Sequence, residues 1–116
     1  MDFNENTDHK ISLAEAAKLT KQFQRIAMNE DINNSDLHYK SIVAHSFRKT
    51  TLISILNQAG CIGIRIYYGL HDDGRPELVL IGIDSQGDDI TDGEIAQHSV
   101  LCPPFCSSQN ELNILR

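Results

Sequence analysis

The sequence lacks most features that mark membrane, nucleic-acid-binding or disulfide-rich proteins. It has no tryptophan and only three cysteines, and no apolar run approaches the roughly 20 residues that span a bilayer. Ten lysines and arginines are outnumbered by sixteen aspartates and glutamates, which gives a formal net charge of −6. Phosphate binding needs clustered basic side chains, and the only such cluster is Arg48-Lys49. We therefore expect neither a membrane segment nor a nucleic-acid partner.

A length of 116 residues suits one domain with a modest core. Residues 1–10 are acidic and polar, which is typical of a disordered leader and unlike a signal peptide, so we expect a cytoplasmic protein. Residues 11–106 form the predicted domain, and residues 107–116 form a polar C-terminal tail.

The strongest structural signal is a predicted β-hairpin over residues 61–83. Alternating apolar residues over 61–70 indicate one strand, and residues 78–83 are apolar on both faces, as in a central strand. The linking segment His-Asp-Asp-Gly-Arg-Pro supplies an Asp-Gly turn and a proline that cannot extend a ladder. We expect this hairpin to form the core, with Ile64 and Ile81 buried.

Two helices flank the hairpin on its N-terminal side. Ser12 and Glu15 form a capping box at the start of a helix predicted over residues 12–28. A second apolar periodicity predicts a helix over residues 50–58, followed by Gly60 at a position that favours positive φ.

Three segments complete the predicted secondary structure. Residues 41–47 suit a short strand or a helical turn, residues 98–101 suit an edge strand, and residues 29–36 form a polar loop. The predicted class is α+β, with two helices packed on a small antiparallel sheet built around the central hairpin.

Cys102 and Cys106 flank a Pro-Pro-Phe segment that holds them close together. They could supply two ligands of a tetrahedral zinc site, with His98 or Cys61 completing it. However, their spacing is not the usual Cys-x2-Cys, and the chain has no second tight pair. We therefore favour ordinary thiols, rank a zinc site second and a disulfide third.

Arg65 and Tyr67 lie on one face of the first hairpin strand together with Cys61 and Gly63. A cation and a phenol between small residues suit a shallow anion-binding groove. The simpler alternative, which we favour, is a surface arginine paired with an acidic neighbour across the hairpin.

No arrangement typical of a catalytic site is present. The five histidines are scattered along the chain, and no glycine-rich loop precedes a helix as phosphate binding requires. The acidic run after Asp84 departs from a calcium-binding loop at Gln86, Asp89 and Ile95, so we interpret it as a solvated loop.

Three blocks of the sequence resemble a family of small uncharacterised bacterial proteins. They are ILNQAGCIGIRIYY at 55–68, LVLIGID at 78–84 and CPPFC at 102–106, and the resemblance extends over residues 11–106. This family has no established activity, so the resemblance implies no catalytic residue, cofactor or substrate. It implies only that the strand pair and the Cys-Pro-Pro-x-Cys segment belong to one unit.

Two functions fit these observations. The favoured one is a non-enzymatic accessory or interaction protein without a cofactor, which forms a homodimer through an uncovered apolar face of its sheet. The alternative is a small metal-binding or thiol-dependent protein that uses Cys102 and Cys106, with zinc as the expected metal.

Overall fold

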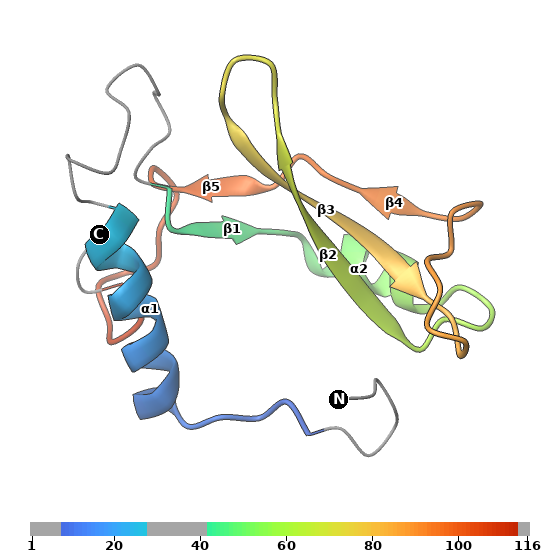
Figure 1. Ribbon diagram of the computed structural model, residues 1–116, viewed down its shortest axis with the longest axis horizontal. Coiled ribbons are helices and arrows are strands. Elements are labelled where there is room, and N and C mark those ends of the chain that lie inside the picture. The colour runs from blue at the N-terminus through green and yellow to red at the C-terminus, as the bar shows by residue number, and fades with distance from the viewer. Residues whose placement is uncertain (1–7, 28–41, 114–116) are drawn as a thin grey trace.

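A computed structural model describes residues 8–27 and 42–113 and confirms the α+β class (Figure 1). In chain order the elements are α1 (Leu13–Ala27), β1 (Ala44–Ser46), α2 (Lys49–Leu56), β2 (Gly63–Leu70), β3 (Pro76–Ile83), β4 (Ile95–Ala96) and β5 (Val100–Cys102). The predicted loop at 29–36 and most of the predicted leader lie outside the described residues. Within the described ranges, no helix is long and apolar enough to cross a membrane.

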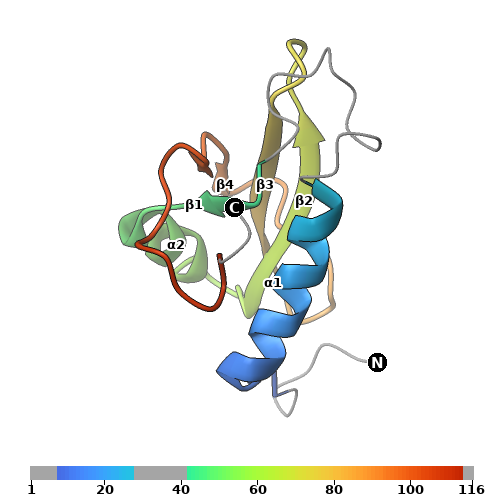
Figure 2. The ribbon, with the colours of Figure 1, turned by 90° about the vertical axis from the view of Figure 1, so that its left-hand side faces the viewer.

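The strands form two antiparallel sheets rather than the single sheet expected from the sequence. One sheet has the order β2-β3-β4, and the other pairs β1 with β5. Figure 2 shows β3 between β2 and β4, so β2 lies at the edge. The two sheets are separate because β5 pairs with β1, far upstream in the chain, instead of extending β4.

The predicted hairpin is confirmed. β2 and β3 pair along their full lengths, from Gly63 opposite Ile83 to Leu70 opposite Pro76. The turn closes where the His71 N–H donates to a carbonyl four residues later, at 2.9 Å, and Gly74 supplies the required positive φ of 88°.

The buried apolar side chains are concentrated on α2 and on the central strand β3. Ile55 of α2 is 1% exposed, and Leu80, Ile81 and Ile83 of β3 are also buried. The prediction for Ile81 is therefore confirmed, but Ile64 is only half-buried. Ile64 lies on β2, which has no neighbour among the described strands on its outer side, whereas β3 is flanked by β2 and β4.

The first helix begins and ends close to the predicted bounds. The Glu15 N–H donates to Ser12 Oγ at 3.0 Å, as a capping box requires. Its packing differs from the expectation, since Figure 1 shows α1 and α2 at opposite ends of the molecule.

Instead of covering the hairpin, α1 contacts the C-terminal segment. Gln24 is buried and donates from Nε2 to the Leu112 carbonyl at 2.7 Å. Leu19, Phe23 and Ile26 stay more than half exposed. The buried side of α1 thus carries small and polar residues, which suit a polar tail better than an apolar sheet.

Candidate functional site

A buried carboxylate at the start of β3 joins three parts of the chain. Glu77 is 7% exposed and accepts five hydrogen bonds. Oε1 accepts from the Leu78 and Ser99 amides at 2.9 and 3.1 Å and from the Ser99 hydroxyl at 2.6 Å. Oε2 accepts from the His98 amide at 3.2 Å and from His71 Nε2 at 3.3 Å.

These donors determine the charge of Glu77. Burial alone opposes ionisation, but the hydrogen bonds from Ser99, the Leu78 amide and His71 outweigh it and lower the pKa of Glu77 to about 2. Glu77 is therefore a carboxylate at neutral pH and only accepts hydrogen bonds.

The charge on Glu77 sets the tautomer of a neighbouring histidine. Nδ1 of His45, on β1, lies 2.7 Å from Ser99 Oγ. Because the Ser99 hydroxyl already donates its proton to Glu77, it can only accept from His45, so Nδ1 carries the proton. Burial lowers the pKa of His45, although the charge of Glu77 opposes this, and the ring is neutral at pH 7. Nε2 then holds a lone pair.

A groove of about 510 Å³ lies beside this network, between α1, β1 and the tip of the hairpin. The side chains that line it include Phe23, Val43, Tyr68, Leu78, His45 and Glu77. Within the described part of the chain, His45 Nε2 has no hydrogen-bond partner, so it is the uncommitted polar atom of that ring. The groove is thus lined by apolar side chains, by the carboxylate of Glu77 and by a histidine ring whose Nε2 is uncommitted.

In the structure, the predicted pair Arg65 and Tyr67 both contact one carboxylate, that of Asp89. Arg65 Nη1 lies 2.5 Å from Asp89 Oδ1, and the Tyr67 hydroxyl donates to Asp89 Oδ2. Arg65 Nη2 also donates to the Gly87 carbonyl at 3.2 Å. The sequence predicted an acidic partner across the hairpin, but Asp89 comes from the loop after β3. Asp89 therefore occupies the place that the sequence predicted for a bound anion.

The protonation equilibria of this cluster follow from the same contacts. The hydrogen bond to Asp89 raises the pKa of both Arg65 and Tyr67, and the Tyr67 hydroxyl in turn lowers the pKa of Asp89. All three groups keep their ordinary charges at neutral pH, so the cluster fastens the loop to β2.

Cys102 and Cys106 form a disulfide, the state ranked third from the sequence. Their Cα atoms are 4.8 Å apart, within the range for this bond. The Pro-Pro-Phe segment folds back on itself, since the Phe105 amide donates to the Leu101 carbonyl at 2.9 Å. This turn brings the two sulfur atoms together more closely than the sequence spacing alone indicated.

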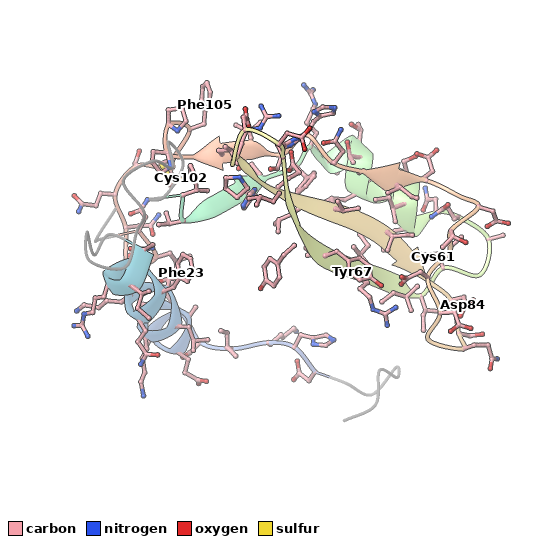
Figure 3. All side chains as sticks on the ribbon, turned by 45° about the horizontal axis from the view of Figure 1, so that its top comes forward. Phe23, Cys61, Tyr67, Asp84, Cys102 and Phe105 are labelled. Atoms are coloured by element: carbon pink, nitrogen blue, oxygen red, sulfur yellow. A yellow bond between two sulfur atoms is a disulfide. The ribbon has the colours of Figure 1, made fainter. Side chains whose placement is uncertain are left out.

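The other predicted metal ligands are held elsewhere. Figure 3 shows Cys61 near Tyr67, at the opposite end of the molecule from Cys102. The Cys61 thiol donates to the Gly63 carbonyl at 3.2 Å, and the His98 amide donates to Glu77. Across residues 8–27 and 42–113, no three side chains of the metal-ligating types are grouped. The zinc site stays a prediction.

The sequence did not indicate the network of Glu77, Ser99 and His45. One signal was available, because Glu77 is the only charged residue in β3, and a charge inside a central strand requires partners. The place of His45 in this network depends on the pairing of β1 with β5, which brings His45 opposite Leu101 and close to Ser99. A single sequence does not give that long-range register.

Comparison with known proteins found no matching family model, no matching curated protein and no matching solved structure. The resemblance of the three sequence blocks to a bacterial family therefore stays a prediction.

Proposed function

We propose that this protein is a non-enzymatic interaction protein that forms a homodimer by pairing the β2 strands of two copies. The observation that carries this proposal is an unprotected edge strand. Among the described strands, β2 pairs with β3 alone, so its other edge has no partner. Unpaired edges of this length act as templates for a further strand.

The register identifies the amides available at this edge. The His71 N–H donates to the Arg75 carbonyl, so these facing residues form a hydrogen-bonded pair. Hydrogen-bonded and non-hydrogen-bonded pairs alternate along an antiparallel ladder. The amides of the even-numbered residues of β2 therefore point away from β3. They belong to Ile64, Ile66, Tyr68 and Leu70.

The side chains of β2 favour association. Ile66, Tyr68 and Leu70 are 55%, 94% and 76% exposed. Natural edge strands usually carry a lysine, a proline or a bulge that blocks pairing. β2 has none of these, and its one charged residue, Arg65, is paired with Asp89.

A two-fold axis at Tyr67 uses all four outward amides. In this register Ile66 lies opposite Tyr68 of the partner subunit, and Ile64 lies opposite Leu70 of the partner subunit. The same register places Arg65 opposite a glycine of the other copy, so the two arginines do not face each other. The paired strands extend the three-stranded sheet to six strands across an isologous interface.

Sedimentation equilibrium of two matched variants tests this proposal. Ile66→Lys places a charge within the paired edge, and we expect it to raise the dimer dissociation constant at least about tenfold. Leu19→Lys makes the same change on α1 at a residue of similar exposure, 59% against 55%, and should leave the constant unchanged. Equal effects of the two variants, or a wild-type mass of 13.0 kDa at all concentrations, would contradict the proposal.

The disulfide supports a second candidate function, thiol–disulfide exchange. Cys102 is 5% exposed, whereas Cys106 is half-buried, so an external thiolate reaches Cys106 more easily. Attack on Cys106 Sγ forms a mixed disulfide, breaks the bond between the two cysteines and releases Cys102 as the thiolate.

Mass spectrometry of the protein treated with glutathione, under acid quench, tests this candidate. We expect the adduct on Cys106, and an adduct confined to Cys102 would contradict the assigned order of attack. Two free thiols in freshly purified protein, with one zinc per chain that is lost in Cys102→Ser, would instead favour the metal-binding alternative.

A further inference from the structure

The groove beside His45 has the composition of a small-molecule site. Its volume of about 510 Å³ lies within the usual range for such sites. Phe23 comes from α1, Val43 from the segment before β1, and Tyr68 and Leu78 from the hairpin. Three separate parts of the chain therefore provide apolar walls around one polar ring.

The His45 ring is held in one tautomer by hydrogen bonds that run from Glu77 through Ser99. Glu77 fixes the direction of the Ser99 hydroxyl, and the Ser99 hydroxyl fixes the proton of His45 on Nδ1. The first of these distances is 2.6 Å and the second is 2.7 Å. A histidine oriented in this way presents Nε2 as a preorganised acceptor, as seen where a carboxylate positions a functional histidine.

The charges around the groove restrict what it can bind. Among the described residues that line it, none is lysine or arginine, and the one formal charge is the carboxylate of Glu77. An anionic ligand would meet this negative charge, and none of the described lining residues supplies a compensating cation. Five hydrogen bonds already occupy the Glu77 carboxylate, so a donor group of a ligand would bond to Nε2 of His45 instead.

We propose that this groove binds a small molecule that has a flat apolar body, no negative charge and one hydroxyl or N–H donor. The apolar body packs between Phe23, Tyr68 and Leu78, and the donor bonds to Nε2 of His45. The groove shares Tyr68 with the dimer contact, but Ile66 does not line the groove. Ile66→Lys leaves the groove lining intact, so failure of dimerisation and failure of ligand binding can be told apart.

Titration of isotopically labelled protein with phenol, anisole and benzoate, followed by NMR, tests this proposal. Phenol has the required donor, anisole is similar in shape but has no donor, and benzoate carries a negative charge. We expect phenol to shift the signals of Val43, His45 and Leu78 and to bind about fivefold more tightly than anisole, the effect of one hydrogen bond. Benzoate should bind most weakly of the three.

The variant His45→Phe keeps an aromatic ring and removes the acceptor. In this variant the preference for phenol over anisole should disappear, whereas His9→Phe, outside the groove, should retain it. The comparison of the three probes on the wild-type protein needs no variant, so the test survives if His45→Phe does not fold. Equal affinity for phenol and anisole, shifts confined to another surface, or no binding at millimolar concentration would each overturn the proposal.

Discussion

Substitution of Gly93 by alanine should destabilise the protein by displacing Gln58. Gln58 follows α2 and joins it to the loop before β4, since Nε2 donates to the Ile55 carbonyl at 2.8 Å and Oε1 accepts from the Glu94 amide at 2.7 Å. A Cβ atom at Gly93 would overlap Oε1 of Gln58 and lie 3.1 Å from Cγ2 of Ile90. The end of the glutamine side chain must therefore move, and we expect this movement to break both hydrogen bonds.

The expected cost follows from these two bonds. Each contributes roughly 0.5 to 1.5 kcal/mol, so Gly93→Ala should lower the free energy of unfolding by about 2 kcal/mol. In a chain of this size such a loss lowers the melting temperature by roughly 5 to 15 °C. Gly69→Ala is the matched control, because a Cβ there meets its nearest neighbour at an ordinary 3.6 Å. Its effect should stay within about 1 kcal/mol.

Urea denaturation of a double-mutant cycle with Gln58→Ala tests the reasoning. Once Gln58 is truncated, Gly93→Ala no longer displaces it, so the second substitution should cost much less than in the wild-type background. The reasoning would be refuted if Gly93→Ala cost no more than Gly69→Ala, or if its cost were the same with and without Gln58.

Three further perturbations have defined outcomes. Glu77→Gln should destabilise the protein at pH 7. The loss in unfolding free energy relative to wild type should shrink as the pH falls from 4.5 towards 2, because the pKa of Glu77 in the folded protein is about 2, below the ordinary 4.5. A difference in urea midpoints that does not change with pH would exclude this lowered pKa. Reduction of Cys102–Cys106 should cost about 2 kcal/mol of unfolding free energy, from the entropy of closing a five-residue loop, and a variant with serine at both positions should not respond to reductant. Asp89→Ala should speed amide hydrogen exchange in its loop, because Arg65 loses its partner; unchanged exchange there would show that the ion pair does not hold the loop.

Local sequence signals predicted most of the elements. The capping residue Ser12, the strand pattern that predicted β2 and the turn glycine Gly74 each act over a few residues. The cap, the strand and the turn each form where they were expected. Packing between distant elements could not be predicted from such local signals. The position of α1 depends on a contact between Gln24 and the tail, and no short-range pattern encodes that contact.

The candidate site was predicted only in part. The sequence indicated that Arg65 and Tyr67 share a face, because strand periodicity fixes that relation. It did not indicate Asp89 as their partner, nor the network of Glu77 and His45, because both need pairings between segments more than 20 residues apart. The disulfide was under-ranked because the cysteine spacing alone does not reveal how tightly the intervening turn folds.

Residue-resolved hydrogen exchange along β2 tests the proposed dimer most directly. The outward amides of Ile66 and Tyr68 should exchange rapidly in dilute protein and become protected as the concentration rises through the dissociation constant. The inward amides of Arg65 and Tyr67, which bond to β3, should be protected at every concentration and serve as the internal control. Rapid exchange at Ile66 and Tyr68 at all concentrations would contradict pairing through this edge.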